Sequence, residues 1–306
     1  MKSAYLAICY ACNQNCKFCP CSKMEKQAKM LTDIHNLKQT IDDLEAQGIT
    51  DVTLSGGEPT LHPHLADLIA YIQSKKMLVT VLSNSERFSS NAFIADFVSK
   101  VDVRRLKVIT TLHASTAEGH EAANQTPGSF IRTVHGLENL FNNGIRVIVK
   151  HCISKENYQE LYEFFEYCNN TFDESIDIQL CSIDYCGIPA DVLAQEKLCF
   201  SEVRPYIERM FDRHLELKEA GNKRKLYCIN MPLCVCDVYY WRYLPRRHEK
   251  TYDQYKDPHN SETTPAQDNV GIHPKFCSAC KVVEICCGTY FTAYDACGPD
   301  IVTPFL

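Results

Sequence analysis

Three cysteines near the amino terminus have the residue type and spacing of ligands to an iron–sulfur cluster. Cys12, Cys16 and Cys19 form a Cys-x3-Cys-x2-Cys run that directly follows the apolar stretch 5–8. Thiolates at this spacing can hold three irons of a 4Fe-4S cluster and leave the fourth iron without a protein ligand. An iron without a protein ligand is open to a reacting molecule, so the motif predicts chemistry at the cluster.

Spacing alone is weak evidence in a chain with 18 cysteines, where structural zinc or incidental thiols would also explain it. Two further features supply context. The aromatic Phe18 precedes the third cysteine, and Gly56-Gly57-Glu58-Pro59 follows later, after a helix-length segment. With both motifs in this order, the sequence resembles the radical S-adenosylmethionine (SAM) enzymes.

The resemblance implies a cofactor chemistry. In the enzymes that this chain resembles, the open iron binds the amino and carboxylate groups of SAM. One electron from the cluster then breaks a carbon–sulfur bond, which gives a 5′-deoxyadenosyl radical that removes a hydrogen from the substrate. The protein supplies positioning and exclusion of water.

The tetrapeptide after the second predicted strand is expected to contact SAM. Gly56 and Gly57 lack Cβ atoms, which lets their backbone approach a ligand closely, and Pro59 fixes the exit from the turn. By resemblance, the two glycines line the site of the SAM amino group, with Glu58 shaping the loop. An ordinary strand-to-helix turn would explain the glycines but not the whole tetrapeptide.

Further cofactor contacts are expected at the ends of the third, fourth and fifth predicted strands. Family members use polar residues there for the ribose and carboxylate of SAM, without fixed identities. His113 could equally be a satisfied histidine in the barrel mouth, and Lys150 could merely pair with an acid. The sequence assigns no catalytic acid or base. The candidates at these strand ends are Ser83, Asn84, His113, Ser115 and Lys150, and Phe18 in the cysteine motif is a further cofactor-binding candidate.

Strand and helix patterns alternate through residues 1–222. Six strand–helix repeats imply an α/β fold with a parallel sheet, whose chemistry gathers at the carboxyl ends of the strands. Periodicity does not separate a partial barrel from an open doubly wound sheet, and the resemblance implies a partial (β/α)6 radical SAM barrel. The predicted strands cover residues 3–9, 51–55, 78–82, 106–112, 146–153 and 176–183.

Residues 223–306 are predicted to form a small, irregular, Cys-rich domain. Its run Cys277-x2-Cys280-x5-Cys286 would suit zinc or a second 4Fe-4S cluster. The run resembles the ligands of SPASM and twitch extensions, which hold auxiliary clusters. Tyr290 stands where the next SPASM cysteine is expected, which suggests one auxiliary cluster with its fourth ligand from upstream.

The fourth auxiliary ligand is predicted to be Cys234, with two sets of substitutes. Cys228 or Cys236 would replace Cys234, and Cys287 would replace Cys286. Seven further cysteines are expected to be buried thiols that pack as small apolar groups. These are Cys9, Cys21, Cys152, Cys168, Cys181, Cys186 and Cys199.

Composition excludes several classes of protein. The net charge of −6 and the isoelectric point near 6.0 disfavour nucleic-acid binding, because no dense basic stripe is present. No stretch is long and apolar enough for a membrane span, and no export signal precedes the cysteines. The protein is therefore expected in the cytoplasm, with reduced thiols that serve iron–sulfur clusters.

The leading hypothesis for function is a maturase that crosslinks a ribosomally made peptide by hydrogen abstraction. The auxiliary-cluster pattern supports it, as does the stretch 113–172, which looks like that of peptide-modifying members. The chain starts at the first strand, so either a separate leader-peptide-binding protein or direct recognition of the core peptide would be needed. An electron donor such as flavodoxin or ferredoxin is also expected. A radical SAM enzyme for a small metabolite is the alternative, and a non-catalytic metal-binding or sensor protein is a third.

Overall fold

One parallel sheet forms the centre of the protein. The computed structural model describes residues 2–19, 31–185, 188, 190–246, 252–256, 271 and 273–306. Within these residues the sheet has eight strands in the order β7-β6-β5-β4-β3-β2-β1-β8. The strands are β1 Ser3–Cys9, β2 Asp51–Gly56, β3 Leu78–Ser83, β4 Leu106–Thr111, β5 Arg146–Cys152, β6 Asp177–Cys181, β7 Leu226–Ile229 and β8 Gln254–Lys256.

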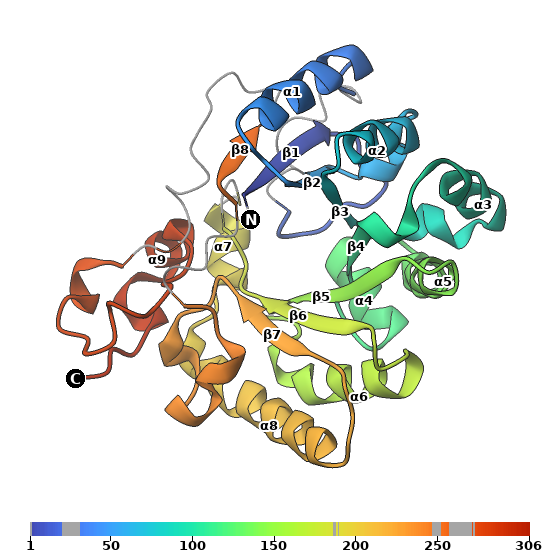
Figure 1. Ribbon diagram of the computed structural model, residues 1–306. Coiled ribbons are helices and arrows are strands. Elements are labelled where there is room, and N and C mark those ends of the chain that lie inside the picture. Colours follow the sequence, from blue (N-terminus) through green and yellow to red (C-terminus); the bar gives the residue numbers. More distant parts are fainter. Residues whose placement is uncertain are drawn as a thin grey trace.

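Helices cover the outer side of the curved sheet, and the C-terminal segment with α9 lies on its other side (Figure 1). The α-helices are α1 Ile34–Ala46, α2 Leu65–Ser74, α3 Asn91–Lys100, α4 Ala117–Asn124, α5 Ser129–Asn142, α6 Leu161–Thr171, α7 Ala190–Glu196, α8 Phe200–Glu219 and α9 Phe291–Cys297. Short 3-10 turns are η2 Pro59–Leu61, η3 Glu86–Ser89, η4 Val103–Arg105, η5 Tyr158–Glu160, η6 Leu233–Val235, η7 Val238–Tyr243, η8 Lys275–Cys277 and η9 Gly298–Ile301.

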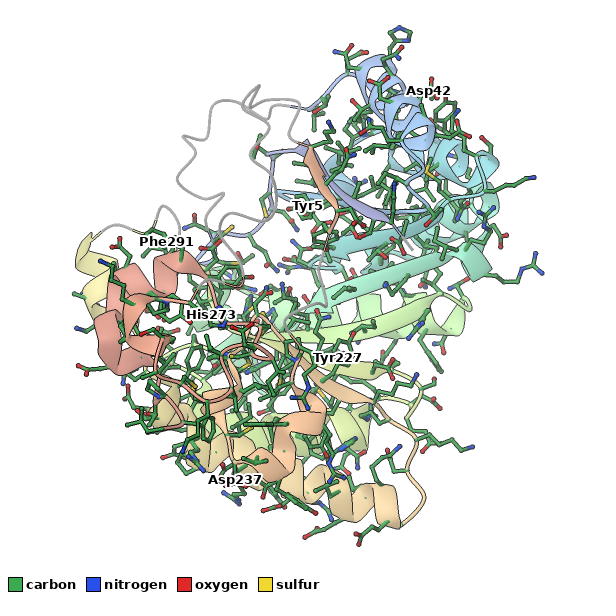
Figure 2. The ribbon with its side chains drawn as sticks, turned by 60° about the vertical axis from the view of Figure 1, so that its left-hand side comes forward. Tyr5, Asp42, Tyr227, Asp237, His273 and Phe291 are labelled. Atoms are coloured by element: carbon green, nitrogen blue, oxygen red, sulfur yellow. The ribbon has the colours of Figure 1, made fainter. Side chains whose placement is uncertain are left out.

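The strands are apolar because a parallel sheet is buried on both faces. Leu6 on β1 and Leu54 on β2 are fully buried and are register partners. Helix α1 shows how the outer layer forms. Asp33 caps it by accepting a hydrogen bond from the His35 backbone N–H at 2.8 Å, and one stripe of the helix is buried against the sheet. Tyr5 on β1, Tyr227 on β7 and Asp42 on α1 mark these layers in Figure 2.

The predicted α/β partial barrel is confirmed, with two strands that the sequence did not indicate. The barrel is not closed, since β7 and β8 stand at opposite ends of the strand order. Both follow residue 222, and they extend the sheet at β6 and at β1. The division at residue 222 therefore stays a prediction, with part of the sheet contributed from beyond it. No helix among the described residues has the length and apolar character of a membrane span.

Candidate active site

The cysteine loop after β1 is held by the loop after β2. The Gly57 backbone N–H donates to the Cys9 carbonyl at 2.7 Å, and the Glu58 N–H donates to the Ala11 carbonyl at 2.7 Å. These bonds continue the parallel pairing of β1 with β2 beyond the strands. The Gly-Gly-Glu-Pro motif is therefore in backbone contact with the residues that lead directly into the cysteine motif.

The two glycines make this contact possible. A Cβ on Gly56 would lie 2.0 Å from the Cys9 carbonyl oxygen, and one on Gly57 would lie 2.2 Å from that of Ala11. Gly56 also has φ of 129°, a backbone conformation that favours glycine. Both missing Cβ positions are thus occupied by the cysteine loop itself. Contact of these glycines with SAM stays a prediction.

Replacing Gly57 with alanine is expected to displace the cysteine loop. Because the added Cβ would meet backbone rather than a mobile side chain, we expect a loss of about 3 kcal/mol in unfolding free energy. Gly48→Ala is the control, since that position has positive φ but open space around it and should cost about 1 kcal/mol. Chemical denaturation measures both. Equal losses in the two variants would contradict the role of Gly57 in loop contact.

Helix α4 supports the cysteine loop from the other side. The Asn15 N–H donates to the Asn124 carbonyl at 3.0 Å, and the Lys17 N–H donates to that of Ala123 at 3.1 Å. Sequence reasoning did not indicate α4, so this support was missed. Thr116, whose side chain accepts from Gly119 N–H, is the capping signal that could have indicated the helix.

The three motif thiols lie close enough to influence one another. Loss of surrounding water raises the pKa of Cys12 to about 11, with Glu58 and Cys19 adding to the effect. Burial, followed by repulsion from Cys19 and Cys12, raises the pKa of Cys16 above its usual range. Such thiols stay protonated unless a cation is present, and a bound metal releases their protons. The donor set therefore suits an iron–sulfur cluster.

A single-ion site is not formed by these thiols. In the part of the chain that the structure describes, no three His, Cys, Asp or Glu side chains are gathered closely enough to hold one metal ion. Zinc would require its ligands around one centre, whereas a 4Fe-4S cluster attaches each thiolate to a different iron. The choice of a cluster over zinc therefore rests on the Cys-x3-Cys-x2-Cys motif.

Glu58 joins the ends of β2 and β3. Its buried carboxylate accepts hydrogen bonds from the Thr60 N–H at 3.0 Å, the Thr60 hydroxyl at 2.6 Å, the Ser83 hydroxyl at 2.8 Å and the Asn84 N–H at 2.7 Å. Burial raises the pKa of Glu58, and these hydrogen bonds oppose the shift. The Asn84 side chain donates onward to Asn13 at 2.7 Å. Glu58 therefore fixes the loop, as the sequence predicted, through Ser83 and Asn84.

We expect Glu58→Gln to destabilise the protein by about 2 kcal/mol, because one carboxylate oxygen would become an NH2 group that faces a donor. Glu118→Gln is the control, since Glu118 is exposed on α4 and should change stability by less than about 0.5 kcal/mol. Thermal unfolding at neutral pH compares the two. A Glu58→Gln variant as stable as the control would contradict the role of Glu58 in joining the ends of β2 and β3.

His113 contacts a predicted cluster ligand. Its Nε2 lies 3.9 Å from the Cys16 sulfur, and its ring packs edge-on against Phe18 at 5.3 Å between ring centres. Burial, reinforced by His120, lowers the pKa of His113 well below its usual value, so the ring is neutral. Its buried Nδ1 has no hydrogen-bond partner among the described residues. A neutral ring with its proton on Nε2 would donate to Cys16 and leave only an acceptor unsatisfied.

The structure brings most, but not all, of the predicted cofactor residues to the cysteine loop. Ser115 is half-buried between β4 and α4, and no hydrogen bond joins its side chain to the described residues. Lys150 lies on β5, where the thiols of Cys181 and Cys152, rather than an acid, raise its pKa. Sequence reasoning missed Glu86, which accepts from the Gln14 side chain at 2.8 Å. No motif marks it.

The four cysteines predicted as auxiliary ligands line one cavity. Cys234, Cys277, Cys280 and Cys286 surround it together with His273, which Figure 2 labels. Burial, with the neighbouring thiols of Cys280 and Cys286, raises the pKa of Cys277 to about 11. The convergence of these thiols agrees with the predicted ligand set, and the binding of a cluster there stays a prediction.

The predicted substitutes lie apart from that cavity lining. The Cys287 thiol donates to the Met231 carbonyl at 3.0 Å, and Cys228 is buried beside Cys236 and Cys287. Of the remaining cysteines, Cys21 and Cys186 lie outside the described residues. The geometry therefore favours Cys234 and Cys286 over their substitutes.

The fold and site define a class of protein. It is a parallel partial barrel that presents, at the carboxyl ends of its strands, a cysteine motif suited to hold three irons of a 4Fe-4S cluster. Residues 6–168 match the Radical SAM superfamily, and the chain belongs to this family. Enzymes of this family use a 4Fe-4S cluster and SAM, which the donor set above suits.

Several characterised proteins are similar to this chain. The Fe-coproporphyrin III synthase of Methanosarcina barkeri is 24% identical over 212 residues, which cover 69% of this chain and 51% of that protein. Mycofactocin maturase MftC of Mycobacterium tuberculosis is 30% identical over 158 residues, which cover 51% of this chain and 39% of that protein. The structure of Streptococcus suis SuiB bound to S-adenosylmethionine shares the fold, with a TM-score of 0.59 and 14% identity. The match covers 74% of this chain and 50% of the SuiB chain. The chain spans about half the length of the curated relatives it matches.

Proposed function

We propose that this protein matures a ribosomally synthesised peptide by removing a hydrogen from it and forming a crosslink. When bound at Cys12, Cys16 and Cys19, the cluster and SAM together supply a one-electron cleavage of a carbon–sulfur bond that starts hydrogen abstraction. The protein's own residues position this chemistry. Glu58 fixes the loop after β2, and the glycines dock that loop on the cysteine motif.

The observation that carries the peptide hypothesis is the cavity lined by Cys234, Cys277, Cys280 and Cys286. A second cluster there would give the enzyme an electron acceptor, which a crosslinking reaction needs because the substrate is oxidised overall. SPASM-like extensions with this ligand run are typical of peptide-modifying members. The similarity to mycofactocin maturase MftC supports the same substrate class.

A small-molecule substrate is the second candidate. The Fe-coproporphyrin III synthase is matched over more of this chain than the maturase is, and its name indicates a tetrapyrrole product. A tetrapyrrole would need a broad apolar surface in the barrel mouth. The half-buried cation of Lys150 at the strand ends is compatible with a carboxylate on either kind of substrate.

Mass spectrometry with two sets of substrates tests the proposal. Cluster-loaded protein would be incubated anaerobically with SAM, a reductant and either short peptides encoded beside its gene or coproporphyrin-type tetrapyrroles. We expect a peptide product that has lost two hydrogens per crosslink, and none with the variant lacking Cys12, Cys16 and Cys19. Turnover of the tetrapyrrole alone would overturn the peptide assignment.

Two partners are proposed with this function. A flavodoxin or ferredoxin would deliver the electron, and a separate protein would bind the leader of the peptide. Co-purification of the tagged chain with the products of neighbouring genes tests both. Full activity with a chemical reductant and a leaderless peptide would remove the need for the leader-binding protein.

A further inference from the structure

Two cysteines outside both predicted ligand sets stand side by side on the sheet. Cys152 ends β5 and Cys181 ends β6, and they are register partners on these parallel strands. The Cys181 thiol donates to the Cys152 sulfur at 3.3 Å. Neighbouring strands lie about 4.8 Å apart, within the range of about 4.4–6.8 Å that a disulfide requires between Cα atoms. Only a small side-chain movement separates the pair from a bond.

The surroundings favour a thiolate on Cys152 and a thiol on Cys181. Lys150 precedes Cys152 by two residues on β5, so both side chains point to the same face of the sheet. The hydrogen bond from Cys181, together with the Lys150 charge, lowers the pKa of Cys152. The same hydrogen bond and burial raise the pKa of Cys181. Tyr252, Tyr290 and His113 also interact electrostatically with Lys150, and Cys16 interacts with Cys152.

This environment differs from that of a structural cysteine. Cys168 on α6 is fully buried, and burial raises its pKa to about 12, as expected for a thiol that only packs. Cys152 is half-buried and stands beside a cation and a second thiol. A reactive thiolate with an adjacent resolving thiol is the arrangement used in thiol–disulfide exchange.

We propose that Cys152 and Cys181 form a redox-active dithiol that low-molecular-weight disulfides oxidise to an internal disulfide. The Cys152 thiolate attacks one sulfur of the disulfide, whose S–S bond breaks and releases one small thiolate. Cys181 then gives its proton to that thiolate and attacks the Cys152 sulfur, which releases the second small thiolate. Two electrons pass from the protein to the small disulfide. This proposal departs from the expectation that both residues merely pack as buried thiols.

Oxidation would also change the charge at the strand ends. The disulfide is neutral, so the Lys150 ammonium would lose its thiolate neighbour and stand more open to an anionic ligand. The redox state of the pair would thus alter the electrostatics of the barrel mouth without moving the sheet. This consequence follows only if the disulfide forms between these two residues.

Disulfide mapping tests the proposal. Anaerobic, cluster-loaded protein would be equilibrated with reduced and oxidised glutathione at several ratios, quenched with acid, alkylated, digested and analysed by mass spectrometry. We expect a Cys152–Cys181 crosslink in the wild type, and a glutathione adduct on Cys152 in Cys181→Ser. In Cys152→Ser, Cys181 should remain a thiol. Cys168→Ser is the control and should leave the crosslink unchanged.

The wild-type result decides the matter even if a variant folds poorly. Alkylation of both Cys152 and Cys181 as thiols in buffers where glutathione is mostly oxidised would overturn the proposal. A disulfide from either residue to a third cysteine would overturn it equally. A crosslink that appears as the glutathione ratio becomes more oxidising would support it.

Discussion

Replacing Cys12, Cys16 and Cys19 together with alanine is expected to remove about four irons per chain and all cleavage of SAM. These thiols are the donors that the loop after β1 presents. The loop itself should persist, because backbone bonds to Gly57, Glu58 and α4 hold it. Iron and sulfide analysis of anaerobically purified protein measures the change.

A matched variant separates loss of a ligand from loss of any thiol. Cys168, Cys199 and Cys297 lie outside both predicted ligand sets, and their combined replacement with alanine removes the same number of sulfurs. This control should keep the iron content of the wild type. A triple variant at Cys12, Cys16 and Cys19 that still made 5′-deoxyadenosine would show that the active cluster lies elsewhere.

Removing Cys234, Cys277, Cys280 and Cys286 is the second large change. These thiols converge on one cavity, so their replacement with serine should remove about four further irons while the first cluster remains. Metal binding at such sites contributes folding free energy, and we therefore expect a clear drop in thermal stability as well. Metal analysis and thermal unfolding measure the two effects.

The same variant distinguishes an auxiliary cluster from zinc. If the wild type carried about four irons together with zinc, and the variant lost the zinc alone, the C-terminal site would be structural. Cys287→Ala serves as the control, because the Cys287 thiol donates to the Met231 carbonyl and does not line the cavity. Loss of metal in Cys287→Ala would contradict the choice of Cys286 as ligand.

Much of the fold was predictable because long elements carry strong periodic patterns. The strands through β6 and helix α1 follow from buried runs and from the Asp33 cap. Strands β7 and β8 were missed because they have only four and three residues, and β8 also pairs with β1 from near the other end of the chain. Local pattern carries little information about such pairings.

The candidate site was predictable only where residue type and spacing coincide. The cysteine motif and Glu58 were indicated by their motifs, and the structure places them in contact through backbone bonds. The role of α4 and the approach of His113 to Cys16 depend on tertiary packing that no spacing encodes. The pairing of Cys152 with Cys181 likewise arises from the register of β5 and β6.

Formation of 5′-deoxyadenosine tests the central claim most directly. Anaerobic, cluster-loaded protein would be mixed with SAM and a strong chemical reductant, and the product measured by liquid chromatography and mass spectrometry. The wild type and the variant lacking Cys234, Cys277, Cys280 and Cys286 should both form it, whereas the Cys12, Cys16 and Cys19 variant should not. A wild-type protein with its full iron content that forms no 5′-deoxyadenosine would contradict the assignment of this site.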